Sequence, residues 1–189
     1  MSNDLTSVGL SEEKLRRAMN GQRMVRVERS PKYADRLDGF VVDVGEKWSL
    51  LAQISDGGFF DGFVAFRLRD VERVRKVKSF ESAYAMTRPE WPPVAPAPVD
   101  LDATAAVILT LAAAGPLIGI QKEHERRGMW IGSIFEVEGR HVYLHEVRPD
   151  ATWHSASLGY KLKAITTVEV GTHYLIGLAA IAGDAPTQN

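Results

Sequence analysis

Short apolar segments of the kind that form strands occur along this chain in two similar groups of five. Some alternate apolar and polar residues and others are runs of β-branched residues, with turn residues such as Ser-Asp-Gly-Gly at 55–58 between them. The first group comprises 24–28, 39–44, 48–54, 62–68 and 71–77, and the second comprises 117–121, 131–137, 141–147, 157–162 and 165–170. A helical pattern precedes each group, and a further helix is favoured at 172–182. The pattern therefore predicts one helix and five strands, present twice.

The two groups are copies of one another at a nearly constant offset. Gly39 corresponds to Gly132, 93 residues later, and this offset holds over most of the length. Beyond Phe60 the offset becomes 94, so that Phe66 corresponds to Tyr160. A repeat of this length is a duplicated small domain, because solenoid units are only about 20–50 residues long. We predict that the copies superimpose strand for strand, with one inserted residue between Phe60 and Phe66.

Each predicted helix has a residue suited to cap its N-terminus. The first helix begins at Ser11, with carboxylates in its first turn, and ends at Asn20-Gly21. The second helix covers 103–114, with Asp102 as its cap and no charged residue after it. A helix that is apolar all round must be covered on more than one side. We expect the other copy or a second subunit to provide that cover.

A change of composition separates the copies. Residues 87–100 contain five prolines, and proline lacks an amide donor and fixes φ, so this stretch is predicted to be an extended, semi-rigid linker. The predicted organisation is a first domain at 9–80, a proline-rich linker at 81–100, and a second domain with a C-terminal segment at 101–182. Domains this small bury a modest share of their surface, so packing of the copies against each other would stabilise both.

The predicted arrangement resembles a known family of small barrels. A short N-terminal helix laid on a five-stranded, strongly bent antiparallel sheet is similar to the Sm-like version of the SH3-type barrel. The segments DGFVVDV at 38–44, FVAFRLRDV at 63–71 and ITTV at 165–168 resemble those of uncharacterised bacterial proteins with such a barrel. The resemblance implies a mainly β (α+β) fold of two tandem five-stranded Sm/SH3-like barrels, each with an N-terminal helix. RNA-binding Sm proteins usually carry an Arg-Gly loop before the last strand, which 68–70 and 162–164 lack, so ring formation and uridine binding are not implied.

Composition narrows the function classes. The chain has a net charge of −1, 45% hydrophobic residues and no cysteine, which excludes disulfides, thiol nucleophiles and thiolate metal sites. No signal peptide is evident at the N-terminus, and the apolar run at 103–120 is broken by Gly115-Pro116, which favours a buried helix over a membrane span. We expect a cytoplasmic protein with no membrane partner, no cofactor and no evident small-molecule substrate.

All five histidines lie in the second copy or its flank, at His124, His141, His145, His154 and His173. Two of them, His141 and His145, share one face of a predicted strand but lie about 13 Å apart, which is too far to bind one metal ion. No Gly-x-Ser-x-Gly sequence accompanies the serines near His154. We therefore expect no metal site, no catalytic residue and no enzymatic activity.

A repeated basic pair is the candidate binding feature. Arg67 and Arg69 in the first copy correspond to Lys161 and Lys163 in the second. Strand alternation would point both pairs outward, away from the apolar residues beside them. One interpretation is a phosphate-binding rim, and the other is an edge strand that charge protects from aggregation. These four residues are the candidate nucleic-acid-binding site.

Two functional hypotheses follow. The leading one is a non-enzymatic binding or scaffold protein of the bacterial cytoplasm, which binds a protein partner or associates with itself as an oligomer. The alternative is an RNA or single-stranded nucleic-acid binding module that uses the repeated basic pair.

Overall fold

The computed structural model describes residues 2–123 and 128–186, and their side chains from residue 9 onward. The first half of the chain contains α1 (Ser2–Asn20), β1 (Met24–Arg29), β2 (Leu37–Val44), β3 (Trp48–Ile54), β4 (Phe60–Arg67), the 3-10 helix η1 (Leu68–Asp70), β5 (Val71–Lys76) and α2 (Phe80–Ala85). The second half contains α3 (Thr104–Ala112), β6 (Ile118–Lys122), β7 (Trp130–Glu138), β8 (His141–Glu146), β9 (Leu158–Lys161), the 3-10 helix η2 (Leu162–Ala164), β10 (Ile165–Val170) and α4 (His173–Ala182). Within the described residues no helix is long and apolar enough to span a membrane.

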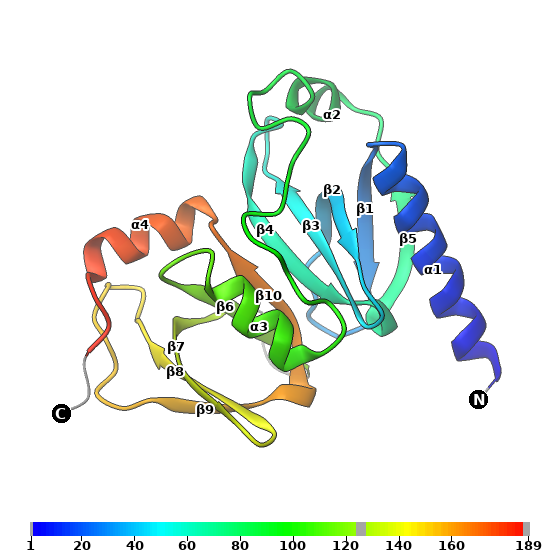
Figure 1. Ribbon diagram of the computed structural model, residues 1–189. Helices are drawn as coiled ribbons and strands as arrows, with labels where there is room; N and C mark the ends of the chain where they lie inside the picture. The colour runs from blue at the N-terminus through cyan, green and yellow to red at the C-terminus, as the bar shows by residue number, and fades with distance from the viewer. Residues whose placement is uncertain (1, 124–127, 187–189) are drawn as a thin grey trace.

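The strands form one antiparallel sheet that passes through both halves of the molecule (Figure 1). Its order is β5-β1-β2-β3-β4-β10-β6-β7-β8-β9, so each half repeats the same local order. β4 pairs with β10, from Phe66 opposite Thr167 to Phe63 opposite Val170. The fold is therefore mainly β, as expected, but its ten strands make an open sheet and not two closed barrels. The backbone N–H and C=O groups on the outer edge of β4 form hydrogen bonds with β10 of the other half. They do not pair with β5 of their own half, which would close a barrel.

The pairing registers repeat at the predicted offset. Val25 pairs with Gly39 across β1 and β2, and Ile118 pairs with Gly132 across β6 and β7, both partners lying 93 residues later. Register shifts also recur at the same place in the β2–β3 and β7–β8 pairs. The strand-for-strand repeat is therefore confirmed.

The inserted residue also lies where the sequence places it. Ile54 pairs with Phe60 in the first half, and Val147 pairs with Trp153 in the second, still 93 residues later. Further along the same strands the offset is 94, because Leu158 in β9 occupies the pairing position of Val64 in β4. The extra residue is accommodated in the loop before β9.

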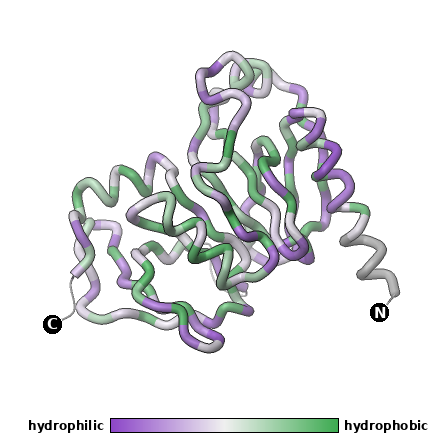
Figure 2. Tube along the Cα trace, in the orientation of Figure 1, coloured by the Kyte–Doolittle hydropathy of each residue, from purple (hydrophilic) through white to green (hydrophobic). Residues whose placement is uncertain are grey.

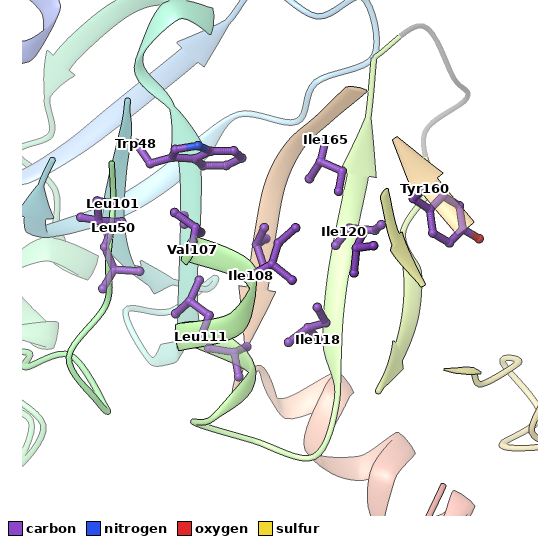
Figure 3. Packing of buried hydrophobic residues seen from close by; sticks show 14 of the residues in the cluster. Trp48, Leu50, Leu101, Val107, Ile108, Leu111, Ile118, Ile120, Tyr160 and Ile165 are labelled. Atoms are coloured by element: carbon purple, nitrogen blue, oxygen red, sulfur yellow. The ribbon is translucent and has the colours of Figure 1, made fainter. Parts of the chain in front are cut away.

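The central strands are covered on both faces. Leu51, Val64 and Phe66 pack in one cluster with Leu15 of α1. Alternating residues of the same strands, including Trp48, Leu50 and Ala65, pack on the opposite face with α3 (Figure 3). The second cluster continues into β6 and β10 of the other half, so one core spans the junction between the halves.

α3 is less enclosed than its apolar sequence suggests. Val107, Ile108 and Leu111 are buried, whereas Leu109 on the opposite side is 50% exposed. The expectation of burial on more than one side is therefore wrong for the side that bears Leu109. The helix lies between the two lobes in Figure 1 and needs only one buried face to join them.

The helix starts also differ from the predicted ones. α1 begins at Ser2, so Ser11 is a buried residue inside the helix and not its N-cap. α3 has Ala103 at its N-cap, with no side-chain hydrogen bond. Asp102 instead accepts a hydrogen bond from the backbone N–H of Glu46, at 2.8 Å, and so fastens the chain before α3 to the first half.

The proline-rich segment is docked on the first half. Trp91 lies edge-on against Phe40, with ring centroids 4.6 Å apart. At its end the backbone oxygen of Leu101 accepts hydrogen bonds from the backbone N–H groups of Lys47 and Trp48. The segment between the halves is therefore held along the sheet over part of its length.

Candidate anion-binding site

The structure separates the four candidate basic residues into two environments. Arg67, at the end of β4, is buried with 4% of its surface exposed. Its Nε donates to Asp70 at 2.6 Å, its Nη1 donates to the backbone oxygen of Lys163 at 2.9 Å, and its Nη2 pairs with Glu123. The prediction that Arg67 points outward is wrong, because its guanidinium joins the two halves.

Arg69 is exposed but contacts the same junction. Its Nη2 lies 3.2 Å from Glu123 Oε1 and 3.5 Å from the backbone oxygen of Lys163. The first basic pair is therefore next to the second half, and its charge is opposed by the nearby carboxylates of Asp70 and Glu123. This pair is poorly suited to recruit a further anion.

Lys161 and Lys163 lie in a different setting, at a hollow of about 610 Å³ in the second half. Both side chains are exposed, and they line the hollow together with Arg140 and His141. No carboxylate is among the described residues that line it. The repeat in the sequence indicates the two lysines, whereas Arg140 and the position of His141 at the hollow emerge only from the structure.

Strand pairing brings the four side chains together. β7 and β8 are joined by a two-residue turn, Gly139-Arg140, in which Gly139 has a positive φ of 55° at the position where such turns favour glycine. His141, which follows the turn, pairs directly with Lys161 on β9. The backbone N–H of Leu162 then donates to the backbone oxygen of Arg140 at 2.9 Å, which holds η2 and Lys163 against the turn. The arrangement is therefore built by regular backbone hydrogen bonds.

The electrostatics of the hollow are one-sided. Arg140, His141, Lys161 and Lys163 form no ion pair with any described residue. The uncapped N-terminus of α3 opens onto the same hollow through Ala103 and Thr104. Its free N–H groups and helix dipole add partial positive charge. The hollow therefore offers cationic donors without a carboxylate to neutralise them.

The histidines do not gather into one group. His145 is buried beside Phe135, whereas His141 on the same strand faces the hollow. In the part of the chain that the structure describes, no three or more His, Cys, Asp or Glu side chains are placed to hold a metal ion. His124 lies outside the described residues.

Pairing register is the signal that could have found the missing site residues. Trp48 pairs with Arg67 in the first half, so the repeat offset alone places His141 opposite Lys161. Arg140 then follows as the residue of the hairpin turn.

Comparison of the chain with protein-family models, with curated proteins and with solved structures finds no match. The functional argument therefore rests on this geometry.

Proposed function

We propose that the protein is a non-enzymatic binding protein of the bacterial cytoplasm, and that it binds RNA or another single-stranded nucleic acid at the basic hollow. The observation that carries the proposal is the convergence of Arg140, His141, Lys161 and Lys163 on one hollow, with no ion pair to a described residue. Phosphate oxygens are the natural partners of such donors, because charge-assisted hydrogen bonds to Arg and Lys are strong. This favours the nucleic-acid hypothesis over a protein partner.

The proposal sets limits on affinity. Each phosphate neutralised on a single strand contributes about −0.7 to the slope of log K against log salt. Three permanent cations in the hollow would therefore give a slope of about −2. The overall net charge of −1 adds no long-range attraction, so we expect binding to be weak at physiological salt.

The test is a salt titration of binding to a labelled, mixed-sequence single-stranded RNA, followed by fluorescence anisotropy. The variant Arg140→Glu/Lys161→Glu/Lys163→Glu should abolish binding and its salt dependence. The matched control is Arg73→Glu/Arg75→Glu/Lys76→Glu, which makes the same charge change on the exposed strand β5. Arg67 is left unchanged, because its substitution would disturb the junction between the halves.

Two outcomes would refute the nucleic-acid proposal. In one, the wild-type protein shows no salt-dependent binding even at low ionic strength. In the other, the control variant loses as much affinity as the hollow variant, so that the attraction comes from overall charge. Thermal melting of both variants verifies that they remain folded.

Self-association is a second candidate, and the free edges of the sheet favour it. β4 and β10 are joined inside the chain, which leaves their counterparts β9 and β5 at the two ends of the sheet. The shared strand order of the halves supports the idea that they are Sm-like units. Sedimentation velocity over a range of concentrations tests association, and a monomer throughout would remove this candidate. Exposed charges on β5, at Glu72, Arg73, Arg75 and Lys76, oppose edge pairing and make it the weaker candidate.

A further inference from the structure

A second cavity lies where the two halves meet, and its lining is unlike that of the basic hollow. It has a volume of about 410 Å³. Its lining includes polar residues, Gln53 of β3, Asp61 of β4 and Glu169 of β10, and apolar residues, among them Met129, Ile131 and Leu178. The cavity therefore combines carboxyl groups with apolar side chains.

Glu169 is the unusual residue of this cavity. Only 9% of its surface is exposed, and it stands on a strand whose residues are all buried. It forms no ion pair with any described residue, and its side-chain hydrogen-bond partner is Gln53. Burial of a carboxylate that has no direct ion pair is costly, and a cation hydrogen-bonded to it inside the cavity would reduce that cost.

Nearby charged side chains are partly engaged elsewhere. Arg29 is the cation whose charge acts on Glu169; its Nη2 donates to the backbone oxygen of Asp35 and to Gln121, while its Nε and Nη1 have no hydrogen-bond partner among the described residues. Asp61 accepts a hydrogen bond from the backbone N–H of His173 at 2.7 Å and lies 3.0 Å from the His173 ring. Glu169 is therefore the carboxyl left to pair with a ligand, while Asp61 adds negative potential beside it.

The shape and chemistry of the lining select the ligand. Two carboxyl groups do not make the set of three ligating side chains that a bound metal ion would need, and no such group occurs among the described residues. An ammonium group satisfies a carboxylate through hydrogen bonds without fixed coordination. The apolar lining residues Met129, Ile131 and Leu178 would bury an alkyl chain.

We propose that this cavity binds a primary alkylamine, whose ammonium group pairs with Glu169 and whose alkyl chain lies against Met129, Ile131 and Leu178. The site is independent of the basic hollow, because the two share no lining residue and the hollow would bind an anion instead of a cation. Binding of the amine would place a small molecule at the junction of the two halves.

The test uses the full chain and two probes of equal shape, n-pentylamine and 1-pentanol, titrated at pH 8 while methyl resonances of Ile131 and Leu178 are followed by NMR. The amine should give saturable shifts, and the neutral alcohol should bind at least tenfold more weakly. Glu169→Gln should lower amine affinity at least tenfold. The matched control is Glu146→Gln, which changes another buried carboxyl that does not line the cavity, and its affinity should equal that of the wild-type protein.

The pH dependence provides an independent readout. Burial raises the pKa of Glu169 to about 7, with Asp35 and Asp61 raising it further and Gln53 and Arg29 opposing the rise. The amine stays protonated over this range, as a lysine does. Between pH 8 and pH 6 the carboxylate fraction falls about tenfold, so amine affinity should fall by the same factor. His173 lies beside Asp61, 3.0 Å from its carboxylate, and does not line the cavity, so His173→Asn should leave the effect in place.

Three results would overturn the proposal. They are the absence of saturable shifts with the amine, equal binding of amine and alcohol, and unchanged amine affinity in Glu169→Gln. Melting temperatures of the variants show whether each is folded, and Gln retains the shape and the hydrogen bonding of the carboxyl it replaces.

Discussion

Arg67 and Lys161 occupy the same position of the repeat, yet they do opposite things. Both stand at the end of the fourth strand of their half, opposite Trp48 and His141 respectively. β4 lies between β3 and β10, so Arg67 is enclosed and ion-paired. β9 lies at the edge of the sheet, so Lys161 is exposed. The place of a strand in the sheet, more than its own sequence, decides whether a basic residue is structural or free to bind.

The residues opposite them extend the comparison. Trp48 is 1% exposed, and the chain before α3 covers it, because Leu101 accepts its backbone N–H. His141 has no such cover and faces the basic hollow. On the fifth strands the second half supplies the interior strand and the first half the edge strand. Glu169 of the interior strand β10 is buried, and its counterpart Arg75 on the edge strand β5 is exposed. At these positions, the two halves therefore carry one interior and one exposed version of the same strand residue.

The largest expected effect is the loss of stability on removing Arg67. Arg67→Ala would leave the buried carboxylate of Asp70 without its 2.6 Å guanidinium partner and would remove one cation beside Glu123, and breaking such a buried pair typically costs about 3–5 kcal/mol. Lys161→Ala, the matched change at the edge, should cost less than about 0.5 kcal/mol. Urea unfolding followed by circular dichroism measures both. Equal losses of stability in the two variants would mean that Arg67 is no more structural than Lys161.

This contrast also explains what the sequence could and could not predict. The period of 93 to 94 residues and the strand segments depend on local pattern and on comparison within the chain, so they were predictable. The pairing of β4 with β10 joins residues about 100 positions apart, such as Phe66 and Thr167, and no local pattern encodes it. Arg67 was therefore expected on the surface, because alternation assigns a side chain to a face of its strand without showing what covers that face.

The residues of the candidate site were likewise predictable only in part. Lys161 and Lys163 were found because they repeat a basic pair. His141 corresponds to Trp48 and repeats no basic residue, and Arg140 repeats a single basic residue, Lys47, which lies outside the predicted strands. The cavity at the junction could not be foreseen, because its walls come from both halves. The sequence predicts that Glu169 is a polar, exposed residue of an alternating strand. It is buried because β10 pairs with a strand on each side.

A smaller effect is expected from Glu169, and it depends on pH. Because burial raises the pKa of Glu169 to about 7, the folded state holds this proton at pH values where the unfolded chain has lost it. Stability should therefore fall as pH rises from about 4.5 to about 7 and stay lower above that. At pH 8 without ligand, Glu169→Gln should exceed the wild-type stability by about 1–3 kcal/mol.

At pH 5 the Glu169→Gln variant and the wild-type protein should be nearly equal, because the carboxyl is then protonated in the fold. Urea unfolding at the two pH values gives the difference directly. Glu146→Gln serves as the comparison, since burial also raises the pKa of Glu146, while the charge of Lys122 opposes the rise. A wild-type protein that gains stability between pH 5 and pH 8, with no change in Glu169→Gln, would show that Glu169 is solvated in the fold.

The smallest effect is expected at Arg75, which occupies the position of Glu169 on the edge strand. Arg75 pairs with Glu28 on β1, and both side chains are substantially exposed, at 48% and 34%. An exposed ion pair gains little Coulomb energy and costs side-chain entropy, so Arg75→Ala should lower stability by at most about 1 kcal/mol. Whatever it contributes should vanish in 1 M salt, because exposed charges are screened there. If Arg75→Ala instead cost as much as Arg67→Ala, and salt left that loss unchanged, the free edge at β5 would be buried by a partner in solution, and self-association would replace nucleic-acid binding as the favoured function.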